Sequence, residues 1–94
     1  MTSEQTGRLD IATIRQTIHE HIQFNFLFDG NEGDFDDDTS LVESGVVDKT
    51  GILEIVLFVE ETYGIEAPES DLTPDNFDTV NNITAYVVRR MADM

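Results

Sequence analysis

The segment that most constrains the fold runs from Asp48 to Gly64. It begins with an aspartate that can cap a helix and ends with a glycine that can close one. Between them, apolar residues cover more than half of a helical surface; they are Ile52, Leu53, Ile55, Val56, Phe58, Val59 and Tyr63. The pattern predicts a helix over 49–63 that is the most buried element, with the others packed around it.

Two further segments repeat apolar residues at helical spacing. The first can be capped by Asp10, ends near Phe24 or Asn25, and carries Ile11, Ile14, Ile18 and Ile22 on one face. The second can be capped by Thr79 and carries Val80, Ile83, Tyr86, Val87 and Met91, with Arg89 and Arg90 near its negative end. Thr73-Pro74 has the order that opens a short helix, ending at Asn76 or Phe77. No strand pattern appears, so the predicted fold is all-α, a small four-helix bundle with three main helices and a short third one.

A long connection joins the first two helices. From Phe26 to Ser40 it alternates large apolar residues with acids, and Gly30 and Gly33 break any helix there. A disordered linker would rarely carry so many phenylalanines, so we predict an ordered loop that its aromatic residues pin to the core. Leu41 and Val42 then return toward the core, and Gly45 permits a sharp turn.

The length and net charge of the chain limit the number of domains and the kinds of partner that it can bind. The chain has 94 residues, enough for one small domain, which we place at 9–92 after a flexible N-terminus at 1–8. The formal net charge of −15 argues against nucleic acid and anionic membranes as partners and favours proteins with basic patches. There is no cysteine, no apolar run long enough to span a membrane, and no signal-peptide pattern. We therefore expect a cytoplasmic monomer.

Catalytic and metal motifs do not fit the sequence. The acidic loop fails as an EF-hand, because counting from Asp29 or from Asp34 puts neither glycine at the sixth position nor glutamate at the twelfth. His19 and His21 are two residues apart on a helix and cannot share a metal ion. No catalytic triad or phosphate-binding glycine loop is present. We expect neither an enzyme nor a metal site, although an acidic structural or cation-binding domain remains an alternative.

The predicted helix over 49–63 also carries acids beside its apolar face. They are Glu54, Glu60 and Glu61, with Asp48 at the start of the helix. Exposed charge is the default for a helix surface, so these residues could serve solubility alone. The alternative is a docking strip for a basic partner, to which Val47 and Ile52 would add apolar contact.

The motif at the head of this helix resembles that of acyl carrier proteins over roughly residues 10–91. Gly45-Val-Val-Asp48 and Leu53-Glu54 fall at the positions of the family signature, in which a serine follows the aspartate. The resemblance implies a four-helix bundle whose signature serine bears a 4′-phosphopantetheine arm with cargo held as a thioester. It also implies that Asp48 helps a phosphopantetheinyl transferase and its magnesium, and that Glu54, Glu60 and Glu61 face partner enzymes.

The signature serine position holds Lys49, the only lysine in the chain. An amine cannot form the phosphoserine ester, and Thr50 lies about 100° further around the helix, so we do not expect it to substitute. We therefore expect no arm on this chain. The leading hypothesis is an engineered serine-to-lysine variant of an ordinary carrier, and the competing one is a natural, degenerate carrier with a docking or regulatory role.

The resemblance leaves the cargo open among fatty acyl, aminoacyl and polyketide or nonribosomal peptide intermediates. An acyl- or aminoacyl-adenylating ligase is the expected loading partner, alongside the transferase and other biosynthetic enzymes. We also expect an apolar interior between the second, third and fourth helices that could shelter a chain.

Overall fold

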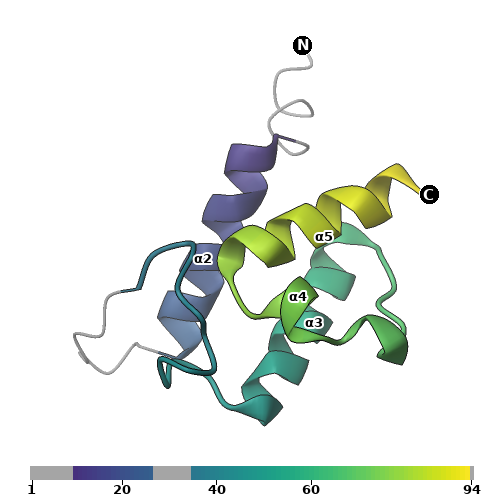
Figure 1. Ribbon diagram of the computed structural model, residues 1–94. Coiled ribbons are helices and arrows are strands. Elements are labelled where there is room, and N and C mark those ends of the chain that lie inside the picture. Colours follow the sequence, from purple (N-terminus) through teal and green to yellow (C-terminus); the bar gives the residue numbers. More distant parts are fainter. Residues whose placement is uncertain (1–9, 27–34, 94) are drawn as a thin grey trace.

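The computed structural model describes residues 10–26 and 35–93. Within them lie α2 (Ile11–Phe26), α3 (Lys49–Tyr63), the 3₁₀ turn η1 (Glu69–Asp71), α4 (Pro74–Phe77) and α5 (Val80–Ala92), and these residues form no strand. The all-α fold with a short third major helix is thereby confirmed (Figure 1). The predicted flexible N-terminus lies outside the described residues. No helix in the described ranges combines the length and apolar character needed to cross a membrane.

The helices begin and end where local chemistry predicts. The Asp48 carboxylate accepts a hydrogen bond from the amide of Gly51, and the Thr79 hydroxyl accepts one from the amide of Asn82. Gly64 closes α3 with φ of 69°, a left-handed conformation that suits glycine. Thr73 precedes α4 but makes no side-chain capping bond, so Pro74 alone favours the start of that helix.

The core contains the predicted stripes with two exceptions. Ile14, Ile18 and Ile22 of α2 are buried, as are Val80, Ile83, Tyr86 and Val87 of α5. Ile11, at the start of α2, is 47% exposed because α2 extends beyond the other helices at that end (Figure 1). Leu53 of α3 is 53% exposed, so the predicted apolar face of α3 is wider than the part that is buried.

The prediction that the other helices pack around α3 was wrong. The central element is α5, which packs mainly against α2 and α4 and less against α3 (Figure 1). Four residues of α3 are buried, whereas Leu53 and Leu57 point outward. Apolar coverage of a helix therefore overstates its burial, since apolar side chains also occur on the surface of a folded protein.

Phe35 joins the connection between α2 and α3 to the core, as predicted. Its ring is buried and stacks on the imidazole of His19, with the ring centroids 4.3 Å apart. Phe26 belongs to the last turn of α2 rather than to the loop. Leu27, Phe28 and the acids from Asp29 to Asp34 lie outside the described residues.

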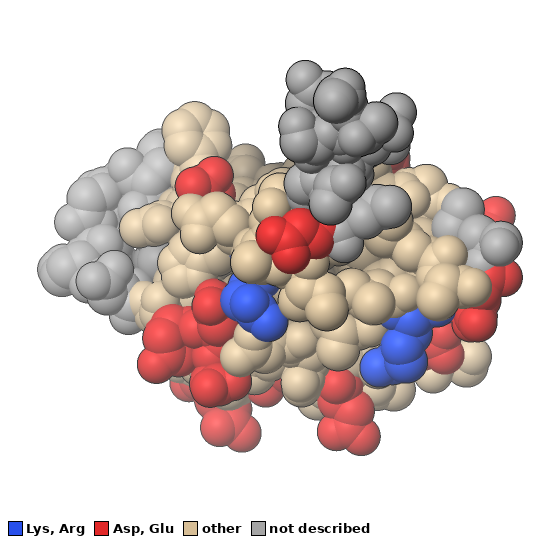
Figure 2. All heavy atoms as spheres, turned by 90° about the horizontal axis from the view of Figure 1, so that it is seen from above, with Lys and Arg blue, Asp and Glu red and all other residues tan. Residues whose placement is uncertain are grey.

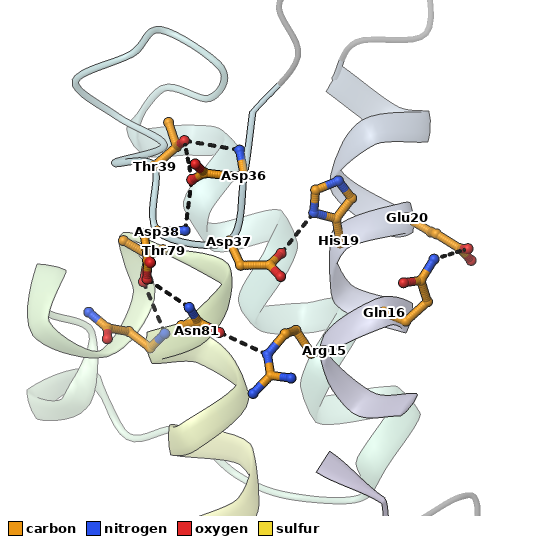
Figure 3. Close-up of polar contacts among 11 residues, drawn as sticks. Arg15, Gln16, His19, Glu20, Asp36, Asp37, Asp38, Thr39, Thr79 and Asn81 are labelled. Atoms are coloured by element: carbon orange, nitrogen blue, oxygen red, sulfur yellow. Dashed lines mark hydrogen bonds and ion pairs between the residues drawn. The ribbon is translucent and has the colours of Figure 1, made fainter. Parts of the chain in front are cut away.

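Polar side chains hold residues 36–39 against two helices (Figure 3). The His19 ring nitrogen Nδ1 lies 2.9 Å from the Asp37 carboxylate. The Asn81 side chain donates to Asp38 at 2.7 Å and accepts from the Arg15 guanidinium at 2.8 Å. The loop is thereby fixed to α2 and α5 together.

The 3₁₀ turn η1 was not predicted. It follows Pro68, and the Tyr86 hydroxyl donates to the Asp71 carboxylate at 2.7 Å, which joins the turn to α5. Burial and this hydrogen bond raise the pKa of Tyr86 to about 12. The turn depends on a residue distant in sequence, which is why local pattern did not reveal it.

Candidate attachment and docking site

A sharp turn delivers the chain to the start of α3. Gly45 has φ of 84°, a conformation that glycine adopts without steric cost. The amide of Val47 donates to the Leu41 carbonyl at 3.1 Å, and the Val47 side chain is buried. Val47 therefore fastens the turn to the core, and the docking contact predicted for it is not available at the surface.

The first turn of α3 is pressed against the end of α2. A Cβ atom added at Gly51 would lie 2.9 Å from the Phe26 ring and 3.1 Å from Cβ of Val47. Only glycine allows this close approach. Because Gly51 faces inward, its neighbours Lys49 and Thr50 face solvent, and both are exposed.

Lys49 is the first residue of α3 and stands where the resemblance places the arm-bearing serine. The one ion pair among residues 10–26 and 35–93 joins His19 to Asp37, so no described carboxylate pairs with the Lys49 amine. Asp48 directs its carboxylate to the amide of Gly51 at 2.8 Å. The position that the resemblance gives to the arm therefore holds an exposed lysine that forms no ion pair with a carboxylate of the described residues.

An apolar groove of about 460 Å³ opens beside Lys49. It is lined by Val42, Glu43, Lys49, Ile52, Leu53, Leu72, Thr73, Pro74, Phe77 and Asp78. The expected apolar space therefore lies between α3, α4 and the turn before α3, and α5 contributes no side chain to it. Ile52 and Leu53 serve as walls of this groove.

The three glutamates of α3 that were predicted to dock a partner differ in exposure and in hydrogen bonding. Glu54 and Glu61 are exposed on α3. Glu60 is half-buried, and its carboxylate accepts a hydrogen bond from the amide of Ala67 at 2.9 Å, so it holds the chain after α3 in place. The two exposed acids share the outer side of α3 with two exposed leucines, Leu57 and Leu53, of which Leu53 had been predicted to belong to the buried face.

The two histidines occupy separate environments, as expected. His21 stacks on Phe58 of α3 with ring centroids 3.7 Å apart. Burial lowers the pKa of His21, and the nearby Glu54 carboxylate opposes that effect. No cluster of three potential metal ligands occurs within residues 10–26 and 35–93.

Charge on the visible surface is predominantly acidic. Figure 2, which views the molecule from above, shows basic side chains as small separate patches beside acidic ones. The separate patches agree with five basic residues against twenty acidic ones. Such a face offers no continuous basic surface for a polyanion.

Known proteins with similar sequences are carriers. The D-alanyl carrier protein of Streptococcus suis (strain 98HAH33) is 32% identical over 78 residues, which are 83% of this chain and 95% of that protein. The probable acyl carrier protein PigG of Serratia sp. (strain ATCC 39006) is 33% identical over 79 residues, 84% of this chain and 90% of that protein. With the D-alanyl carrier protein of Lacticaseibacillus casei (strain BL23), 36% identity covers 53% of this chain and 62% of that protein. No protein-family model matches the chain.

The small helical bundle and these relatives together define a carrier-type domain. With relatives that it matches over nearly their whole length, the chain belongs to the acyl carrier protein family. The members of this family that it resembles are carriers rather than enzymes.

Proposed function

We propose that this chain is a carrier-type docking protein that does not bear the phosphopantetheine arm of its family. The observation that supports this proposal is the exposed Lys49 at the first position of α3. Its relatives are named as carriers of D-alanyl or acyl groups, and in the family such cargo is held as a thioester on the arm. The fold and the partner-facing helix are retained, and the attaching hydroxyl is absent.

The residues at the attachment position do not fit the arm. Its phosphodiester requires a hydroxyl oxygen, and Lys49 supplies a nitrogen. Thr50 is exposed and has a hydroxyl, but it lies about 100° further around α3. Asp48, which the resemblance links to the transferase and its magnesium, caps the helix through Gly51. An introduced substitution and a natural loss of serine lead to the same expectation, and the sequence of the source gene distinguishes them.

Mass spectrometry tests this proposal directly. The chain, Lys49→Ser and Lys49→Ser/Thr50→Val are each incubated with coenzyme A, magnesium and a phosphopantetheinyl transferase of broad specificity. We expect no adduct on the chain and one phosphopantetheine adduct on both variants. An adduct on the unaltered chain would show that it is modifiable, and no adduct on Lys49→Ser would remove support for the carrier site.

The docking part of the proposal concerns the outer side of α3. Glu54 and Glu61 supply negative charge, and Leu53 and Leu57 supply apolar area beside it. Such a surface complements a partner with a basic patch around an apolar centre. The transferase and an acyl- or aminoacyl-adenylating ligase are the partner classes that we propose.

Charge reversal separates specific docking from general acidity. Transferase binding to Lys49→Ser is compared with binding to the same protein carrying Glu54→Lys, Glu61→Lys or the control Glu20→Lys. Glu20 lies on α2 and is exposed, so the net charge changes equally in all three. We expect weaker binding and a shallower salt dependence only for the two α3 variants. Equal losses in all three would indicate a nonspecific electrostatic effect.

The alternative function is that of a structural or cation-binding acidic domain. Its support is the acidic segment of the long connection, most of which lies outside the described residues. Calorimetric titration with calcium discriminates between the two functions. Tight stoichiometric binding favours the alternative, whereas weak binding that disappears in salt is what a domain of charge −15 should show.

A further inference from the structure

A single positive charge stands at the head of the acidic docking helix. We propose that Lys49 pairs with the pyrophosphate of coenzyme A bound to a phosphopantetheinyl transferase, so that the loaded transferase holds the chain without modifying it. The inference rests on the proposed docking function and adds to it the liganded state of the partner. The chain then competes with carriers that have a serine at this position.

Lys49 is available to a partner because no acid on its own helix can reach it. The residues one turn further along α3 are Ile52 and Leu53, which carry no charge, whereas an acid at either position could pair with the ammonium. The Lys49 side chain is exposed and forms no ion pair with a carboxylate of residues 10–26 and 35–93. In a chain with twenty acids and five basic residues, a cation is thus presented at the position of the arm-bearing serine.

Backbone donors at the same place add to the attraction for an anion. The amides of Lys49 and Thr50 find no acceptor among the described residues, whereas the next amide, of Gly51, is capped by Asp48. These amides and the ammonium lie together at the first turn of α3 as potential donors to a phosphate oxygen.

Nearby carboxylates explain why the anion has to be delivered by a partner. Two of them line the groove beside Lys49. Asp78 is occupied, since its carboxylate accepts from the Ser40 hydroxyl at 2.6 Å. Glu43 makes no ion pair with a described residue and opposes an anion. One ammonium against one such carboxylate is too little to hold a free phosphate compound, so the docking contacts along α3 have to supply the remaining affinity.

Coenzyme A in the transferase is the anion that docking would bring to this position. Transfer of the arm joins a serine oxygen to a phosphorus of coenzyme A, so the side chain at this position faces the pyrophosphate. Lys49 places a cation there on a flexible stem, and charged hydrogen bonds to phosphate are stronger than the neutral bond of a hydroxyl. While paired as an ammonium, the nitrogen has no lone pair with which to attack phosphorus.

Binding of the chain to the transferase, measured by calorimetry with and without coenzyme A, tests the inference. We expect coenzyme A to tighten binding about tenfold, the lower end of what close charge pairs contribute at interfaces. By linkage, a saturating amount of the chain should tighten the binding of coenzyme A to the transferase by the same factor. Lys49→Gln should lose this dependence and Lys49→Arg should retain it, and coenzyme A should not bind the chain when the transferase is left out.

A matched control separates pairing at Lys49 from net charge. Arg89→Gln also removes one positive charge, and Arg89 is an exposed residue in the last turn of α5. That end of α5 lies away from the start of α3 (Figure 1). Arg89→Gln should therefore keep the full effect of coenzyme A.

Competition extends the test to the regulatory consequence. Transfer of the arm to Lys49→Ser is followed at saturating coenzyme A, and the chain should inhibit it about tenfold more strongly than Lys49→Gln does. The inference is overturned, and docking stands, if coenzyme A leaves binding unchanged or weakens it, or if Lys49→Gln keeps the effect. Equal losses in Arg89→Gln and Lys49→Gln, or tight binding of coenzyme A to the chain alone, also overturn it. No binding of the chain in either state removes the docking function as well.

Discussion

Two stretches of the chain that follows α2 are held in different ways. Residues 36–39 are fixed by side-chain hydrogen bonds to α2 and α5, through His19, Arg15 and Asn81 (Figure 3). Residues 45–51 are fixed by backbone geometry, packing and local backbone hydrogen bonds, through the left-handed Gly45, the buried Val47 and the close approach of Gly51 to Phe26. The side chains of Lys49 and Thr50, at the start of α3, are exposed.

This difference explains how the domain combines order with an accessible site. A hydrogen-bond network around Lys49 would position the residue but occupy its polar groups. Shape restraint places the backbone and leaves Lys49 and Thr50 exposed. The network around residues 36–39 supplies the rigidity that a long loop otherwise lacks.

The largest effect is expected at the network. In Asn81→Ala, the bonds to Arg15 and Asp38 are both lost, and at 0.5–1.5 kcal/mol each the free energy of unfolding should fall by about 2 kcal/mol. Urea unfolding measures this change. Asn82→Ala is the matched control, because Asn82 is exposed and contributes its backbone amide to the helix cap. A loss in the control as large as that in Asn81→Ala would contradict the assignment.

The second largest effect is expected from filling the close contact between Gly51 of α3 and Phe26 of α2. In Gly51→Ala, the new methyl would meet Phe26 and Val47 within 3.1 Å. We expect the free energy of unfolding to fall by about 1.5 kcal/mol, although alanine is intrinsically the better helix residue by about 1 kcal/mol. Combining it with Phe26→Leu should recover part of the loss. A gain in stability from Gly51→Ala alone would show that α2 and α3 are not in close contact there.

The helix cap should contribute less than either. Asp48→Ala removes the bond to the amide of Gly51 and should lower the free energy of unfolding by about 1 kcal/mol. Asp48→Asn retains a capping oxygen and should retain most of the stability. Thermal unfolding of both variants measures the difference, and equal losses would mean that the charge of Asp48 matters more than its hydrogen bond.

Whether a contact joins residues close in sequence or distant in sequence explains which parts of the fold could be predicted. Asp48, Gly64 and Thr79 mark helix ends through bonds to residues nearby in the chain, so their roles were predicted correctly. The bonds of Asn81 to Arg15 and Asp38 join segments far apart in sequence, and no local pattern contains them. Leu53 was predicted to belong to the buried face and is 53% exposed, because its burial depends on tertiary packing that a local pattern does not contain.

At the candidate site, too, features set by nearby residues were predictable from sequence, and features set by tertiary contacts were not. The backbone position of Asp48 and Lys49 at the start of α3 was predicted, because capping and the helix pattern are local. The free state of Glu54 and Glu61 and the involvement of Glu60 with Ala67 could not be distinguished, since all three are glutamates on one helix. An apolar space between the second, third and fourth helices was expected, but the groove lies between α3, α4 and the turn before α3, because a linear pattern does not specify how these segments pack.

The smallest expected effect compares the two histidine contacts. His19 stacks on Phe35 within the network, whereas His21 stacks on Phe58 between α2 and α3. Burial lowers the pKa of His21 below its usual 6.5, despite Glu54. The unfolded chain then binds the proton more readily, so this contribution to stability is full above pH 6.5 and is lost as the pH falls through the lower folded pKa. His21 is partly exposed, so we expect less than the loss of the helix cap.

Urea unfolding of the chain and of His21→Gln at pH 7.5 and 5.5 isolates this contribution, because the other titrating groups are shared. The chain should lose more stability between the two values than the variant does. Glu54→Gln sharpens the test, since removing the opposing carboxylate should lower the pKa of His21 further in an NMR titration. A His21 pKa above 6.5 would show that the Glu54 carboxylate outweighs burial, and the stabilising contribution derived from burial of His21 would then be wrong.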